Sequence, residues 1–198
     1  MVKTNGKTGR LTWTLNEGTL IIKGNGTMPN YRNFKEPPWW VFHEIITTVI
    51  VEEGVTTIGD HAFCCCERLA SVSIPNSVTS IGNNAFDGCE KLISITIPDS
   101  VTNIGSCVFT ECWDLKSIVI PDSVTNIGYL AFEHCYSLKQ IFVLSKDPPL
   151  IDKHIVVNDD HCTLYVPIGS KDKYAQAEGW KEFKNIQEDI SKEELLKK

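Results

Sequence analysis

A 23-residue internal repeat constrains the fold of this chain more than any other feature. An Ile-Gly pair, a Phe, a Cys and a Leu each recur at this interval. The repeated residues are Ile58-Gly59, Ile81-Gly82, Ile104-Gly105 and Ile127-Gly128; Phe63, Phe86, Phe109 and Phe132; Cys66, Cys89, Cys112 and Cys135; and Leu69, Leu92, Leu115 and Leu138. Because side chains at a fixed interval stack into columns, the sequence predicts a solenoid.

One unit, SVTSIGNNAFDGCEKLISITIPD, can be interpreted position by position. Ile95 and Ile97 alternate with Ser94 and Thr96, which indicates a strand with one buried face. The following Pro-Asp-Ser is typical of a turn. The small and apolar residues of 85–92 suit a short helical turn against the core. A lone unit buries too little apolar surface to offset its backbone entropy, so neighbouring units must stack.

The repeat continues in degenerate form at both ends. Upstream, four residues lie 23 positions before repeated core residues: Trp40, Ile46, Val49 and Val51. Downstream, three residues lie 23 positions after Ile141, Val143 and Leu144: Leu164, Val166 and Pro167. Atypical terminal units are expected of a solenoid, because they must cover an exposed core.

The flanking segments suggest caps. Residues 11–23 read as a β-hairpin with a turn at 16–18. Residues 144–161 break the period, so we expect an irregular excursion there. Ser170 is placed to cap a short helix, and SKEE at 191–194 fits a capping box before a second one.

The unit S-V-T-x-I-G-x-x-A-F-x-x-C-x-x-L-x-x-I-x-I-P-D resembles the BspA-like leucine-rich repeats, which are common in gut and oral bacteria and in some parasitic protists. Residues 11–40, from LTWTL to PPWW, look like that family's N-terminal cap, and residues 163–186 look like its closing segment. The resemblance covers nearly the whole chain. It implies protein binding, including adhesion to host matrix proteins and other surface recognition, without catalysis.

The predicted fold class is therefore an α/β leucine-rich repeat solenoid. It has a parallel β-sheet on one face, short helical or turn segments on the other, a β-hairpin N-cap and a mixed C-cap. We divide the chain into residues 1–45, the cap and degenerate first repeat; 46–143, the repeats; and 144–198, the excursion, last strand and helical cap.

Composition excludes several kinds of partner. The net charge is −6 and no Lys/Arg cluster stands out, which argues against nucleic acid and anionic membranes. No apolar run is long enough to span a bilayer. The N-terminus MVKTNGKTGRLTWTL lacks the apolar stretch of a signal peptide. We expect a cytoplasmic protein, or a secreted or surface protein whose leader has been removed.

The eight cysteines suggest neither a disulfide framework nor a metal centre. Cys64, Cys65 and Cys66 are consecutive, which suits no unique pairing, so we expect reduced thiols; cross-rung disulfides are the alternative. His43 falls in the column of Cys66 and its repeats, but a linear column does not converge as zinc ligands must. We expect Cys64 and Cys65 on the surface, with no catalytic role and no cofactor.

Outward positions that vary between repeats carry the functional signal. One strand column reads Ile50, Ser73, Thr96, Val119, Phe142, Tyr165; two others end Glu90, Trp113, Tyr136 and Asn83, Ser106, Tyr129. Exposed aromatics on a rigid sheet are typical anchors for a partner. Our hypothesis is a partner-binding patch of Trp113, Tyr129, Tyr136, Val119, Phe142 and Tyr165. The alternative is that they pack against residues 144–161 and the C-terminal cap.

Three function classes follow. A non-enzymatic module that binds a protein partner, such as a host matrix or surface protein, fits the repeat pattern best. A structural or self-assembling repeat protein is the second. A thiol-dependent enzyme is the third, and it requires perturbed acids or thiols gathered in a pocket.

Overall fold

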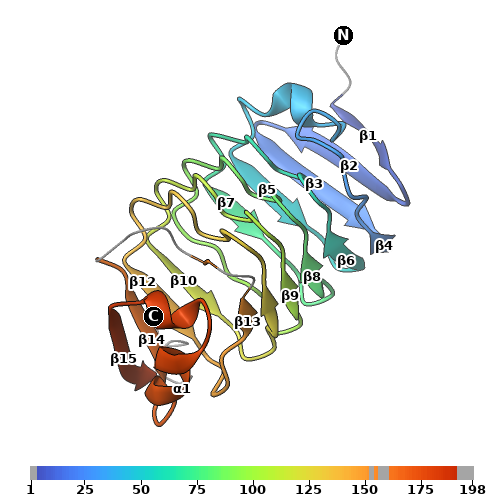
Figure 1. Ribbon diagram of the computed structural model, residues 1–198. Helices are drawn as coiled ribbons and strands as arrows, with labels where there is room; N and C mark the ends of the chain where they lie inside the picture. The colour runs from blue at the N-terminus through green and yellow to red at the C-terminus, as the bar shows by residue number, and fades with distance from the viewer. Residues whose placement is uncertain (1–3, 152–153, 156–160, 191–198) are drawn as a thin grey trace.

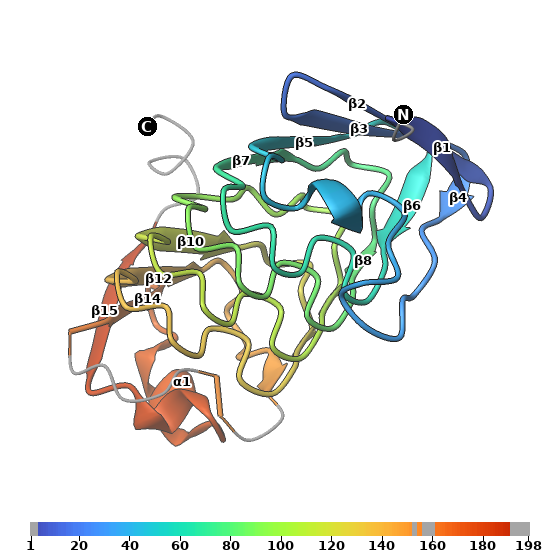
Figure 2. The same cartoon turned by 90° about the horizontal axis from the view of Figure 1, so that it is seen from above.

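The computed structural model describes residues 4–151, 154–155 and 161–190. The chain winds into a short coil, with the N-terminal hairpin at one end and the helical C-terminal segment at the other (Figure 1). A typical rung contributes a strand to one sheet, a shorter strand to a second sheet and a run of turns on the third side. Seen along another direction, the rungs lie side by side and each contacts its neighbours (Figure 2). The predicted solenoid is confirmed.

The first sheet begins with the predicted hairpin. Its strands, in spatial order, are β1 (Asn5–Thr8), β2 (Leu11–Asn16), β3 (Thr19–Gly24), β5 (Thr48–Val51) and β7 (Ser71–Ser73). β1, β2 and β3 are antiparallel, and the pairing becomes parallel from β3 to β5 onward. Glu17 and Gly18 both have positive φ, at 46° and 78°, as a two-residue hairpin turn of type I′ requires.

This face continues at the C-terminal end as a second group of parallel strands. They are β10 (Ser117–Ile120), β12 (Gln140–Val143), β14 (Thr163–Pro167) and β15 (Asn185–Ile190). Ile141 pairs with Leu164, so the predicted last strand is confirmed. In the intervening rung, where we expected a full strand, the pairing narrows to a single bridge between Thr96 and Val119. Ile95 and Ile97 nevertheless stay buried, so the inward alternation is retained.

The second sheet was not predicted. It consists of six short parallel strands: β4 (Gly26–Thr27), β6 (Val55–Ile58), β8 (Ser80–Ile81), β9 (Asn103–Ile104), β11 (Asn126–Ile127) and β13 (Leu150–Ile151). Most contribute two residues per rung, too few for an alternation pattern to be visible in sequence. β13 lies inside the stretch where we expected an irregular excursion, and Phe132 N–H donates to the carbonyl of Ile155 at 3.0 Å. This part of the stretch therefore follows the repeat.

The third side is built mainly of turns, one of the two forms predicted there, and residues 52–139 contain no helix. Two columns adopt left-handed backbone with φ between 53° and 70°: His61, Asn84, Cys107 and Leu130, and Cys65, Gly88, Glu111 and His134. Main-chain bonds join these turns across rungs, for example Phe63 N–H to the Ala85 carbonyl at 2.9 Å. All three sides are thus hydrogen-bonded between rungs.

The core contains a continuous aromatic stack. Phe63, Phe86, Phe109 and Phe132 lie with ring centroids 5.4–5.7 Å apart. Trp39 extends the stack beyond Phe63 at 5.8 Å, although the 23-residue spacing assigned this place to Trp40. The 3-10 helix η1 (Trp40–Phe42) shifts the register by one residue, and the half-buried Trp40 ring stacks on His43 instead. The assignment of Trp40 to the core column was therefore wrong.

The C-terminal end is closed by α1 (Lys171–Gln176) and the 3-10 helix η2 (Trp180–Glu182). Trp180 is fully buried, and its indole N–H donates to the Pro149 carbonyl at 2.8 Å. Ser170 occupies the predicted N-cap position, but its side chain makes no capping bond. The Lys171 N–H is bound by Glu188 Oε1 at 2.7 Å instead. The capping box predicted at 191–194 lies outside the described residues.

None of the helices in the described residues is long and apolar enough to cross a membrane.

Candidate protein-interaction surface

Three of the predicted patch residues form one row across the outer face of the C-terminal strands. Val119 pairs with Phe142 between β10 and β12, and Phe142 pairs with Tyr165 between β12 and β14. The Phe142 and Tyr165 rings stack with centroids 4.7 Å apart and an interplanar angle of 16°. All three side chains are half-buried, because each is covered by its neighbours in the row but not from outside. The row is a flat apolar strip held by main-chain pairing.

Trp113 and Tyr136 lie beside this strip, where the turns lead into the strands. They occupy the same position in consecutive rungs, and Ser137 N–H donates to the Trp113 carbonyl at 3.2 Å. Tyr136 is 70% exposed and Trp113 is 41% exposed. The Tyr136 hydroxyl lies 3.2 Å from His134 Nδ1, which holds the ring at the surface. Neither aromatic is buried under the C-terminal cap.

A hollow of about 680 Å³ separates Tyr136 from Tyr165. Its polar lining comprises Lys116, Ser117, Ser137, Lys139, Gln140, His161 and Thr163. Lys116 and Lys139 form no ion pair with any residue in the described part of the chain. Two lysine side chains therefore line the hollow between two tyrosines without an acidic partner in the described structure.

Tyr129 is set apart from the other patch residues. It directly follows β11 of the second sheet, at a different corner of the coil from Tyr136, which precedes β12. Its ring is 38% exposed and lies 6.4 Å from His154. The structure therefore groups Trp113, Tyr136 and the strip around Val119, and leaves Tyr129 on another side.

Our sequence reasoning missed the lysines of the hollow. Lys116 and Lys139 are 23 residues apart and occupy one column, so the repeat itself carried the signal. A search for consecutive basic residues could not find them, because a solenoid brings together residues one period apart.

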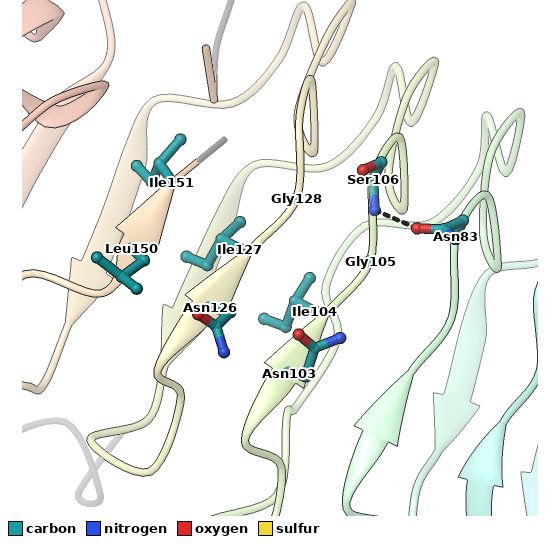
Figure 3. Close-up of a pocket in the computed structure, with 10 residues that line it drawn as sticks. All are labelled: Asn83, Asn103, Ile104, Gly105, Ser106, Asn126, Ile127, Gly128, Leu150 and Ile151. Carbon is teal, nitrogen blue, oxygen red and sulfur yellow. Dashed lines mark hydrogen bonds between the residues drawn. The ribbon is translucent and has the colours of Figure 1, made fainter. Parts of the chain in front are cut away.

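A groove lies over the second sheet, and Figure 3 shows the residues that line its C-terminal part. Two adjoining hollows of about 320 and 440 Å³ share Asn83, Asn103 and Gly105. A Cβ atom at Gly105 would stand 2.5 Å from the main-chain nitrogen of Asn83. Glycine at this position therefore allows the two adjacent rungs to approach closely. Asn83 Oδ1 accepts from Ser106 N–H at 2.8 Å, and Asp60 Oδ1 accepts from Asn83 N–H at 2.7 Å. The groove's best acceptors thus already bind the next rung, which makes it a poorer candidate site.

The cysteine column is buried, and none of the eight cysteines, all of which lie in the described residues, forms a disulfide. Cys89 donates to the Phe63 carbonyl and Cys112 to the Phe86 carbonyl, both at 3.3 Å. Burial raises the pKa of the Cys66 thiol to about 12, so these sulfurs stay protonated. Cys64, which we expected at the surface, is only 5% exposed, so that expectation was wrong; its Sγ lies 3.5 Å from Cys65 Sγ and 3.8 Å from Asp87 Oδ2 of the next rung.

His43 does not join the cysteine column. Its Nδ1 lies 2.9 Å from the Trp40 carbonyl and its ring is stacked on the Trp40 indole. Among the residues that the structure describes, no three His, Cys, Asp or Glu side chains are arranged to hold a metal ion.

Comparison with known proteins identifies the repeat. A family model described as the BspA type leucine-rich repeat region matches residues 42–153 in six copies. A leucine-rich repeat protein from Eubacterium ventriosum is similar, with a TM-score of 0.56 and 22% identity over 83% of this chain and 61% of that one. The pneumococcal vaccine antigen PcpA gives a TM-score of 0.65 and 22% identity over 90% of this chain and 48% of that one.

At this level of identity, the likeness to solved structures shows the fold alone. The chain spans 61% and 48% of the length of these two structures. No curated protein matches it.

Proposed function

The chain belongs to the BspA-type leucine-rich repeat family, and from that membership we propose that it is a non-enzymatic module that binds a protein partner on the outer face of its C-terminal rungs. The observation that supports this most is the apolar strip of Val119, Phe142 and Tyr165 beside the exposed rings of Trp113 and Tyr136. Hot spots in protein interfaces are enriched in such aromatic anchors, held rigidly and surrounded by polar groups.

The hollow between Tyr136 and Tyr165 indicates the chemistry of the partner. Lys116 and Lys139 line the hollow, and neither forms an ion pair in the described structure. A partner that inserts Asp or Glu side chains would therefore be complementary in charge to the hollow. The partner that fits is a folded protein with an acidic loop flanked by apolar residues. The family resemblance favours a host matrix or surface protein.

The first experiment identifies the partner and tests the aromatic anchors. The purified chain is crosslinked in extracts of the producing cell and of a host, and the captured protein is identified and purified. Its affinity is then measured for the Trp113→Ala/Tyr136→Ala variant, which should bind at least tenfold more weakly. Tyr129→Ala is the matched control, an exposed aromatic on another side, and should bind within about twofold of the original chain.

The second arm tests the charge. Lys116→Glu/Lys139→Glu should weaken binding and reduce its dependence on salt, because the steering charge is reversed. Lys7→Glu/Lys23→Glu makes the same change in net charge at the exposed N-terminal hairpin and should leave affinity unchanged. Equal affinity of both double variants, with unchanged melting temperatures, would remove this surface from the proposal. Concentration-dependent oligomers in light scattering, with no captured partner, would favour self-assembly instead.

A further inference from the structure

Cys64 and Cys65 bring two sulfur atoms together on the turn side of the coil. Their Sγ atoms lie 3.5 Å apart, with Cys64 buried and Cys65 half-buried. Side chains of consecutive residues diverge in extended backbone, but Cys65 has φ = 60°, which turns both to one side. This conformation is fixed by the Cys65 N–H, which donates to the Asp87 carbonyl at 2.7 Å.

Asp87 and Gly88 of the next rung lie beside the pair. A Cβ on Gly88 would stand 3.8 Å from Cys65 Sγ, an ordinary van der Waals distance. Asp87 Oδ2 lies 3.8 Å from Cys64 Sγ and also accepts from Asn84 Nδ2 at 3.1 Å. The hydrogen bond from Cys64 lowers the pKa of the Cys65 thiol, and the same bond raises that of Cys64. One sulfur of the pair therefore ionises more readily than an ordinary thiol.

The sulfur separation favours bridging by a third atom over a direct disulfide. The Cα atoms of consecutive residues are about 3.8 Å apart, below the usual disulfide range of about 4.4–6.8 Å. With bonds of about 2.3 Å, the length of a zinc–thiolate bond, sulfurs 3.5 Å apart meet a bridging atom at about 100°. This is far from the linear geometry of a two-coordinate metal and close to that of a pyramidal trivalent centre.

The protein supplies two ligands to a bridging atom at this place, the Sγ atoms of Cys64 and Cys65. Zinc takes four, and the described residues contain no group of three or more metal-ligating side chains arranged for it. A trivalent arsenic atom with one carbon substituent needs two further bonds, both of which thiolates form readily.

We propose that Cys64 and Cys65 form a two-thiol binding site for trivalent arsenic compounds that carry one organic group. An organoarsenic oxide reacts with the two thiols by forming two As–S bonds and breaking both bonds between arsenic and oxygen. The two thiol protons leave with that oxygen as one water molecule. Arsenic stays trivalent throughout, so no oxidant or reductant takes part.

The remaining thiols are poor competitors. Cys66, Cys89, Cys112, Cys135 and Cys162 are buried, and burial raises the pKa of the first four. Cys107 is half-buried like Cys65, but burial raises its pKa and no thiol–thiol hydrogen bond is formed by it in the described structure.

Phenylarsine oxide is the probe for the test, applied to the full chain after reduction with a phosphine. Native mass spectrometry should show one phenylarsenic group per chain, and bound chain should lose two alkylatable thiols. Cys64→Ser and Cys65→Ser should each bind about a hundredfold more weakly, because the second As–S bond becomes impossible. Cys107→Ser, the half-buried control, should bind like the original chain.

Peptide mapping of the alkylated chain provides a second measurement that does not depend on a variant folding. Protection should fall on the peptide that contains Cys64 and Cys65. No adduct, an adduct mapped to other cysteines, unchanged affinity in Cys65→Ser, or a Cys64–Cys65 disulfide that persists under the phosphine would each overturn the proposal.

Discussion

At the residue scale, side-chain acceptors join consecutive rungs where the second sheet ends. Asn30 Oδ1 accepts from Asp60 N–H at 3.1 Å, Asp60 Oδ1 from Asn83 N–H at 2.7 Å, and Asn83 Oδ1 from Ser106 N–H at 2.8 Å. Each bond satisfies a main-chain donor that the short strands leave unpaired. Asp60, Asn83 and Ser106 lie 23 residues apart and share one period position, whereas Asn30 lies 30 residues before Asp60 and extends the series outside the repeat.

Asn83→Ala should lower the free energy of unfolding by about 1–2 kcal/mol, because the Ser106 N–H loses its acceptor. Asn103→Ala is the matched control, since the Asn103 amide has no hydrogen-bond partner in the described structure. It should change stability by less than about 0.5 kcal/mol. Urea unfolding followed by tryptophan fluorescence measures both, and equal losses would show that the side-chain ladder contributes nothing.

At the scale of the element, the row of turns carries its own column of buried thiols. Cys89, Cys112 and Cys135 each donate to the carbonyl of the Phe 26 residues earlier, as Cys135 does to Phe109 at 3.0 Å. Burial raises the pKa of both Cys66 and Cys135 from 9.0 to about 12. Ionisation of these thiols therefore destabilises the folded turn side.

This gives a pH dependence of defined sign. Between pH 9 and 12 the unfolded chain releases thiol protons that the folded chain retains, so stability is full below pH 9 and falls as pH rises. At pH 10 each such thiol costs about 1.4 kcal/mol. Cys66→Ala/Cys135→Ala should therefore lose less stability between pH 8 and 10 than the original chain, measured by urea unfolding under reducing conditions. Parallel pH profiles would contradict the assigned burial.

At the scale of the whole molecule, the coil is held by contacts between successive rungs and by its two ends. Trp39 covers the first Phe of the aromatic stack and donates to the Ala62 carbonyl at 2.7 Å, while Trp180 covers the C-terminal end. Because a rung contacts mainly its neighbours, the stability of such an array is close to a sum of local terms. The number of rungs can therefore change without a change of fold.

Deletion of residues 82–104 joins Ile81 to Gly105 and removes one complete period. The shortened chain should fold with a circular dichroism spectrum of the same shape and a cooperative thermal transition. Deletion of residues 82–93 is the control, because it joins Ile81 to Ser94 and places a strand where Gly82 should begin the turns. That variant should lose the cooperative transition; if both deletions behave alike, the rungs are not interchangeable units.

The sequence by itself determined the 23-residue period, and with it the positions of the repeated core residues along the solenoid. The Phe and Cys columns, the hairpin at 11–23 and the last strand at Leu164 follow from counting in steps of 23 or from alternation along one strand. Such patterns are local or strictly periodic, and a stack of rungs converts them directly into buried and exposed columns.

Tertiary structure alone decided which residues end the core stack and on which side of the coil each exposed residue lies. A one-residue shift put Trp39 in place of Trp40, and Cys64 is buried although Asp87 and Thr110, one and two periods later, stay half-buried. The separation of Tyr129 from Tyr136, and the lysine hollow beside the latter, depend on which side of the coil each turn faces. Local backbone angles set these relations, and a repeat pattern records spacing along the chain but not those angles.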